Sequence, residues 1–187
     1  MKVLEKFNFK TIYAVYPMSA IVATAYDGER KAVMSLVWHT PLSFDPPLYG
    51  ISVSPKRFSH DVILSARAFA VHYFHYDKSD FVENVGSVSG KYTDKYKEFS
   101  IDFFLSPLNN PIIKGAFLVL DCYYVKHVVL GDHTLIVGEI QRVYYDEDRV
   151  ELKDDYVLLK DKRTVLYAGM GEYITVDPKT LIKLRKV

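Results

Sequence analysis

Short apolar runs bounded by glycine, proline and acidic residues recur along the chain, a pattern typical of β-strands. Two pairs of these runs predict hairpins. Gly28 supplies the positive φ that the first turn needs, and Gly131-Asp132-His133 joins the second pair. A loop is expected between Pro41 and Pro47. The predicted strands cover residues 21–26, 31–38, 48–53, 68–74, 101–105, 116–130 and 134–145.

Helical spacing of apolar residues is confined to two short segments. The first covers residues 59–65, where Ser59 is the expected N-cap. The second covers residues 77–88, where the apolar residues share one face and Gly90 stands where a C-terminal glycine cap belongs. Both helices are therefore expected to be small insertions between strands.

The C-terminal third of the chain has a weaker pattern. Residues 152–176 predict short pieces and an arm, and residues 179–187 form a basic tail. Short strands without a βαβ rhythm indicate a closed antiparallel barrel rather than a doubly wound sheet. A G-x-G-x-x-G dinucleotide site is therefore not expected, and the sequence contains none. A hydrophobic fraction of 49% suits one core, so residues 1–187 are expected to form a single domain.

Charge and composition narrow the class of partner and the compartment. The 24 Lys and Arg nearly cancel the 23 Asp and Glu, so no long-range field favours nucleic acid or an anionic membrane. Residues 1–10 contain no apolar signal core, and apolar runs such as 116–120 are too short to cross a bilayer. A lone Cys122 within an apolar stretch predicts a buried, inert thiol and a cytoplasmic protein.

The amide content is low. Glutamine occurs once and asparagine four times, while charged residues make up 25% of the chain. This exchange of labile amides for charge resembles the composition of thermophile proteins.

An anion site is the first candidate for chemistry. Lys56, Arg57 and Ser59 stand just before or at the start of the first predicted helix, where free backbone amides and the helix dipole favour a phosphate. Arg57 can bind two oxygens at once, and Ser59 can donate its hydroxyl. The alternative is a capped helix behind a solvated basic turn.

A second candidate is the apolar strand that ends in the single tryptophan. Met34, Ser35, Leu36, Val37 and Trp38 could form a flat wall whose backbone N–H groups bind an aromatic ring system. The alternative is that these residues are core.

Two further kinds of site have weak support. His72 and His75 are close in sequence, but no H-E-x-x-H pattern or cysteine partner accompanies them, so no metal site is expected. The serines of residues 86–90 have the wrong spacing for a nucleophile elbow, so a Ser-His-Asp hydrolase is not expected.

Several segments together resemble the flavin reductase-like, FMN-binding split-barrel family, which includes flavoredoxins and ferric reductases. The likeness runs from about Tyr16 to Tyr173, in the order and spacing of the family's motifs. The segments that carry it are AVMSLVW (32–38), LSFDPPL (42–48), RFSHDVI (57–63), SGKYTDKY (89–96), GDHTLIVGE (131–139) and the C-terminal Leu166, Tyr167, Gly169 and Tyr173.

This resemblance implies a mainly β fold, an antiparallel Greek-key split β-barrel with short helical insertions. It implies FMN with its phosphate on Lys56, Arg57 and Ser59, its isoalloxazine ring along residues 34–38, and Ser52 between them. Two departures weaken the ring assignment.

His72 replaces an asparagine that is common in the family, and residues 31–33 lack the usual asparagine before the methionine. The roles of His72, Asp94 and Lys95 stay open.

The function implied is an NAD(P)H-dependent flavin or ferric reductase, in which hydride passes from nicotinamide to flavin and the cofactor carries the chemistry. His133 could contact nicotinamide or supply a proton, or be a turn histidine bonded to Asp132. NADH and NADPH are not distinguished, nor is the final acceptor.

Two other functions stay open. One is a flavoredoxin-like carrier that exchanges electrons with a partner protein, and the other is an interaction module that has lost flavin. The resemblance also implies a homodimer with flavin near its two-fold interface.

Overall fold

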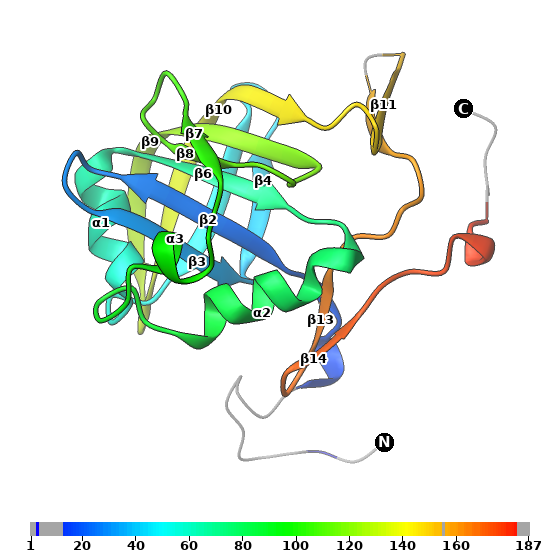
Figure 1. Ribbon diagram of the computed structural model, residues 1–187, viewed down its shortest axis with the longest axis horizontal. Coiled ribbons are helices and arrows are strands. Elements are labelled where there is room, and N and C mark those ends of the chain that lie inside the picture. The colour runs from blue at the N-terminus through cyan, green and yellow to red at the C-terminus, as the bar shows by residue number, and fades with distance from the viewer. Residues whose placement is uncertain (1–2, 4–12, 155, 183–187) are drawn as a thin grey trace.

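A seven-stranded antiparallel sheet forms the centre of the computed structural model, which describes residues 3, 13–154 and 156–182 (Figure 1). The strand order is β3-β2-β6-β9-β10-β5-β4. The mainly β, antiparallel fold is therefore confirmed. The strands are β2 (Ile21–Tyr26), β3 (Lys31–Leu36), β4 (His39–Ser43), β5 (Leu48–Val53), β6 (Ala68–Tyr73), β9 (Leu118–Leu130) and β10 (His133–Tyr145).

The sheet ends at β3 and β4, and the chain passes from one edge to the other through Val37 and Trp38. Within the described part of the chain no strand pairing joins β3 to β4, so hydrogen bonds do not close the barrel. The strand pattern alone had predicted a closed barrel, and the family resemblance a split one. The carbonyl of Trp38 accepts a hydrogen bond from the backbone N–H of Ser52, at 2.8 Å. The connecting residues therefore lie against the end of β5.

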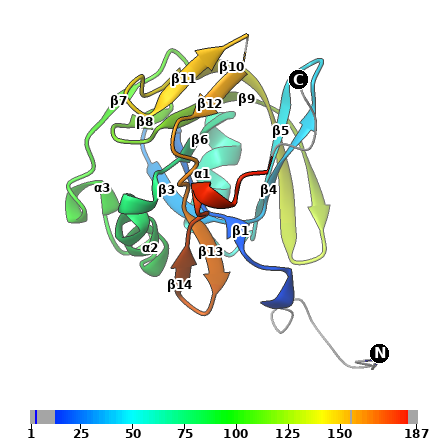
Figure 2. The ribbon, with the colours of Figure 1, turned by 90° about the vertical axis from the view of Figure 1, so that its right-hand side faces the viewer.

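Smaller elements cover the ends and faces of this sheet (Figures 1 and 2). The helices are α1 (Phe58–Ala66), α2 (Ser79–Ser87) and α3 (Lys95–Glu98), with 3-10 turns at Tyr13–Val15, Tyr76–Lys78 and Pro178–Thr180. The short strands are β1 (Met18–Ser19), β7 (Phe103–Leu105), β8 (Pro111–Ile113), β11 (Val150–Lys153), β12 (Tyr156–Leu159), β13 (Leu166–Gly169) and β14 (Glu172–Ile174). They pair as β1-β13-β14, β7-β8 and β11-β12.

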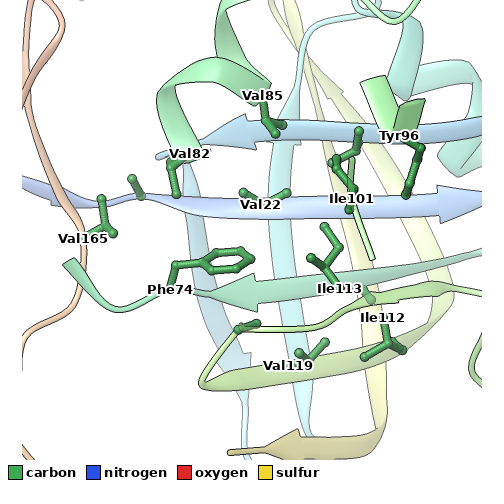
Figure 3. Close-up of a cluster of buried hydrophobic side chains, with 14 residues drawn as sticks. Val22, Phe74, Val82, Val85, Tyr96, Ile101, Ile112, Ile113, Val119 and Val165 are labelled. Carbon is green, nitrogen blue, oxygen red and sulfur yellow. The ribbon is translucent and has the colours of Figure 1, made fainter. Parts of the chain in front are cut away.

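Both faces of the central strands are buried, which explains why β2 and β6 read as continuous apolar runs. Val22 of β2 and Phe74 pack with α2, α3 and β8 on one face (Figure 3). The neighbouring Ile21 packs with Ile51, Ile63 and Phe69 on the other face, beside α1. Alternate residues of one strand thus serve two cores.

Two predicted helix ends are wrong in detail. The N-cap of α1 is Arg57, which has extended φ and ψ, and Ser59 lies inside the first turn. The helix α2 ends at a C-cap Val88, and Gly90 is not the cap. A Cβ at Gly90 would lie 2.8 Å from the Phe58 ring, so this glycine is needed for close approach of a loop.

Strand boundaries differ from the prediction at several places, most of them by one or two residues. The expected loop around Pro41 contains β4, which pairs with β5 and has a register shift after Pro41. Since proline is tolerated in an edge strand, the residue type did not exclude this element. The strand β3 ends at Leu36, and β10 already begins at His133, which pairs with Leu130.

The predicted pieces of 152–176 are present as short hairpins. Figure 2 shows β11-β12 and β13-β14 at opposite ends of the molecule. Part of the basic tail, residues 183–187, lies outside the described residues. Cys122 is fully buried, and burial raises the pKa of its thiol, as expected for an inert cysteine.

Candidate functional site

A cleft of about 310 Å3 opens where the ends of β3 and β5 meet the start of α1, the start of β10 and the loop after α2. All the site residues predicted from the sequence line this one cleft. They are Met34, Ser35, Leu36, Val37, Trp38, Ser52, Lys56, Arg57, Ser59 and His133. Their roles toward a ligand remain predictions.

One end of the cleft is formed by the turn that leads into α1. The backbone N–H of Arg57 donates to the carbonyl of Ser54 at 2.9 Å, so the turn is closed by its own backbone. Closing the turn therefore does not require the side chains of Lys56 and Arg57. Neither forms an ion pair with any carboxylate among the described residues.

Lys95 adds a third cation at this end, and the sequence analysis had left it without a role. Its side chain lines the cleft although the residue is only 6% exposed. Nζ donates to the carbonyls of Val33, at 3.0 Å, and Val85, at 2.6 Å. Burial, with the nearby charge of Arg57, lowers the pKa of Lys95 to about 8.

A lysine this buried is ordinarily paired with a carboxylate, because desolvation of an ammonium group is costly. Among the described residues the hydrogen-bond partners of the Lys95 ammonium group are both carbonyls, and the charge that acts on it is the like charge of Arg57. The electrostatics of this end therefore favour an anionic ligand.

The loop after α2 forms the wall facing these cations. Gly86 of α2 lies close to β3, where a Cβ would be 3.4 Å from that of Ser35. The Ser35 hydroxyl donates to the carbonyl of Val82, which fixes α2 on the strand. With Gly90 packed on the Phe58 ring, small residues keep the loop near the start of α1.

The other end of the cleft is aromatic. The rings of Trp38 and His133 have centroids 4.8 Å apart and are inclined at 50°. His133 Nδ1 lies 2.8 Å from a carboxylate oxygen of Asp132, as the turn-histidine interpretation predicts. The ring also lines the cleft, and its contact with nicotinamide stays a prediction. The predicted wall is also partly core, since Met34 and Leu36 pack against buried residues beside α1.

An apolar groove of about 450 Å3 adjoins the cleft and shares Trp38 and Ser52 with it. His39 lines this groove, and its Nε2 lies 3.0 Å from the carbonyl of Ser19. Because a carbonyl can only accept, this nitrogen carries the hydrogen, and Nδ1 accepts from the hydroxyl of Tyr49. Met18, Thr40, Gly50 and Leu135 complete the lining.

His72 has a structural role. It is fully buried, its Nδ1 donates to the carbonyl of Val22 at 3.1 Å, and its Nε2 accepts from the N–H of Ile113 at 3.0 Å. Burial lowers the pKa of His72 to about 4, so the ring is neutral and joins three strands. His75 is bonded to Asp161 instead, and the described residues contain no group of three or more potential ligands suited to a metal ion.

Comparison with known proteins identifies the family. The sequence model of the flavin reductase-like domain matches residues 14–168. The chain belongs to this family. An FMN-binding protein from Thermus thermophilus with bound 1-cyclohex-2-enone is 32% identical, with a TM-score of 0.87 over 98% of this chain and 99% of that one.

Two more distant relatives carry flavin-related names. An FMN reductase (NADH) of Agrobacterium fabrum is 26% identical over 136 residues, which are 72% of this chain and 74% of that protein. The flavoredoxin of Methanosarcina acetivorans, 24% identical over 97% of each chain, shares the fold with a TM-score of 0.82. The described part of this flavin reductase-like domain contains no helix long and apolar enough to cross a membrane.

The residues present fit FMN, which the similar Thermus thermophilus protein is named for binding. FMN has a doubly charged phosphate at one end and a planar ring system at the other. The cleft offers unpaired cations at Lys56, Arg57 and Lys95, and an aromatic and apolar wall at Trp38 and His133. The donor set therefore matches both parts of the molecule.

Proposed function

We propose that this protein binds FMN in the cleft and acts as an NAD(P)H-dependent flavin or ferric reductase. The observation that carries the proposal is the group of three cations, without carboxylate partners among the described residues, in one cleft with an aromatic and apolar wall. When bound, FMN supplies a hydride acceptor that takes two electrons from the nicotinamide ring and passes them to an acceptor. The role of the protein is then to bind FMN, to orient the two rings and to exclude water from them.

The phosphate is assigned to Lys56, Arg57, Ser59 and Lys95. Arg57 can donate two parallel hydrogen bonds, Lys95 and Lys56 add positive charge, and Ser59 in the first turn of α1 adds a hydroxyl. The ring system is assigned to the wall from Met34 to Trp38, whose backbone N–H groups need no special side chains, and Ser52 lies between the two ends. His133 is assigned to the nicotinamide, as a contact or a proton donor.

No dinucleotide fingerprint anchors NAD(P)H, so we expect the nicotinamide to bind transiently beside Trp38 and His133. A flavoredoxin-like carrier that receives electrons from a partner protein would need the same FMN site. A flavin-free interaction module is disfavoured, because it would leave the buried Lys95, beside the positive charge of Arg57, without a counter-charge.

The deciding experiment is anaerobic addition of NADH or NADPH to the FMN-loaded protein. The proposal predicts that the absorbance of bound FMN bleaches with at least one nucleotide. If dithionite bleaches the flavin and neither nucleotide does, the reductase function fails and the electron carrier replaces it. If the protein binds no FMN, both fail.

A second candidate concerns the acceptor. The groove beside the cleft is almost wholly apolar, and the Thermus thermophilus FMN-binding protein is named with 1-cyclohex-2-enone bound. We propose that small planar carbonyl compounds bind next to Trp38. Cyclohex-2-enone should then change the fluorescence of Trp38, the single tryptophan. A change that saturates with ligand concentration, and that is the same in variants of surface residues far from Trp38, would support the site. No change at millimolar ligand would contradict it.

We also propose a homodimer. Large apolar side chains are exposed on the β4-β5 turn and the β9-β10 hairpin, including Phe44 at 100% and Val129 at 68%. Such residues ordinarily mark an interface. Light scattering at micromolar concentration should give twice the chain mass of 21.5 kDa, and a monomeric mass with flavin bound would contradict the proposal.

A further inference from the structure

A buried hydrogen bond joins the two ends of the cleft. Nε2 of His60, in the first turn of α1, lies 3.0 Å from Oγ1 of Thr134 at the start of β10. His60 is 8% exposed and Thr134 is 1% exposed, so water hardly competes for this bond. It is the one hydrogen bond between α1 and β10 within the part of the chain that the structure describes.

The direction of this bond follows from the other ring nitrogen. His60 Nδ1 lies 2.9 Å from a carboxylate oxygen of Asp61, which can only accept. In the neutral ring Nδ1 therefore carries the hydrogen, and Nε2 accepts from the Thr134 hydroxyl. Asp61 thus holds His60 in the tautomer that binds Thr134.

Each partner is next to residues assigned to FMN or nicotinamide. The backbone N–H of His60 donates to the carbonyl of Arg57 at 3.0 Å, and His60 follows Ser59 directly. Thr134 follows His133, which contacts Trp38, and Thr134 pairs with Val53 of β5. This bond therefore adds a side-chain link between α1 and β10 to the backbone pairing of β10 with β5.

We propose that His60 is a positioning residue that holds the His133 and Trp38 end of the cleft at a fixed separation from Arg57 and Ser59. This inference rests on the proposed function, in which FMN spans both ends. A ligand that is anchored at two points binds more tightly when the points are already at the right separation. The bond should therefore favour FMN over riboflavin, which lacks the phosphate and uses only the ring end.

The first test compares the affinities of the apoprotein for FMN and riboflavin. Thr134→Val removes the hydroxyl at nearly constant shape, and Thr134→Ser keeps it. The loss of one buried hydrogen bond should lower the FMN-to-riboflavin affinity ratio roughly threefold to tenfold in Thr134→Val, and Thr134→Ser should restore it.

A matched control is Thr24→Val. Thr24 is likewise fully buried in a strand, and its Oγ1 donates to the carbonyl of Pro111 at 2.6 Å, but it does not line the cleft. This variant should lower the melting temperature without changing the affinity ratio. It therefore separates loss of stability from loss of positioning.

The second test needs no flavin. Trp38 is the single tryptophan, and its indole ring contacts the ring of His133. In the apoprotein at one fixed pH, His133→Gln should change the fluorescence of Trp38, because this ring contact is lost. Thr134→Val should change it in the same direction, whereas Thr134→Ser and Thr24→Val should leave it as in the parent.

The proposal requires both effects. It is overturned if Thr134→Val matches Thr24→Val in either the affinity ratio or the Trp38 signal. If the parent protein binds neither flavin, the proposed function fails, and the Trp38 signal alone decides whether this bond positions His133.

Discussion

The phosphate end and the ring end of the cleft are built by different means. The phosphate end is built mainly from one short segment, since Lys56, Arg57 and Ser59 lie in one turn and the first turn of α1, and Lys95 of α3 joins them. The ring end brings together Trp38, between β3 and β4, and His133, at the start of β10, which are far apart in sequence. The first depends on local chain geometry and charge, and the second on the packing of the whole sheet.

The two ends also differ in the energy they can supply. Charge-assisted hydrogen bonds to a phosphate contribute about 1.5–3 kcal/mol each, and no carboxylate of the described residues forms an ion pair with the cations here. The ring end offers apolar area and backbone groups, which orient a planar molecule without strong selection. We therefore expect the phosphate end to determine affinity and the ring end to determine reactivity.

The largest expected effect is on FMN affinity at the phosphate end. Arg57→Ala should weaken FMN binding roughly tenfold or more, because one charge-assisted contact is lost, and should leave riboflavin binding unchanged. Arg57→Lys keeps the charge but cannot donate two parallel hydrogen bonds, so its FMN affinity should lie between those of Arg57→Ala and the parent. Fluorescence titration of both flavins measures this. Equal FMN affinity in Arg57→Ala and the parent would remove the phosphate assignment.

The next effect belongs to the ring end. His133→Ala should slow anaerobic bleaching of bound FMN by NAD(P)H by about tenfold, the order expected for one lost contact to the reacting partner, while FMN affinity stays near that of the parent. Stopped-flow absorbance separates the two quantities. If His133→Ala lowered the FMN affinity as much as the rate, the ring end would determine affinity as well as reactivity, and the contrast between the two ends would be wrong.

The sequence predicts those parts of the site that depend on neighbouring residues better than those that depend on the packing of distant elements. The cations at residues 56 and 57 could be proposed because a turn followed by a helix is a local signal, and the family resemblance then favoured a phosphate site over a solvated turn. Lys95 could not, since its position depends on the carbonyls of Val33 and Val85, which belong to two other elements. The SGKYTDKY segment drew attention to it, but nothing in that segment shows that the side chain reaches the cleft.

The fold shows the same limit. Alternating apolar runs predicted the central strands, while β4 was missed because Pro41 and its exposed neighbours resemble a loop. Its place is set by pairing with β5, a contact that no local pattern contains. Likewise His72, open in the sequence, proves to be a neutral core residue only once its backbone partners are known.

A smaller effect at the phosphate end should appear as a pH dependence. In the apoprotein Lys95 has a pKa of about 8, and a bound phosphate would raise that pKa because it favours the charged form. FMN binding should therefore take up protons near pH 8, and affinity should fall as pH rises from 7 to 9.5, by roughly fivefold for one charge-assisted contact. Riboflavin should show no such fall.

The control for this prediction is Lys95→Met, which keeps much of the side-chain volume without the charge. In that variant the fall in FMN affinity between pH 7 and 9.5 should disappear, and isothermal titration in two buffers of different ionisation heat should detect no proton uptake. Persistence of the pH dependence in Lys95→Met would assign it to another group.

The smallest expected effect tests the boundary between the two ends. Ser52 lines the cleft near the end of β5, and its backbone N–H donates to the Trp38 carbonyl. Ser52→Ala should weaken FMN and riboflavin equally, by roughly threefold, because a neutral hydrogen bond to the shared part of both flavins is lost. Ser59→Ala removes a hydroxyl of the same kind from the phosphate end and should weaken the binding of FMN but not of riboflavin. A selective loss of FMN in Ser52→Ala would extend the phosphate end to β5, so the two serines together locate where charge recognition stops and ring orientation begins.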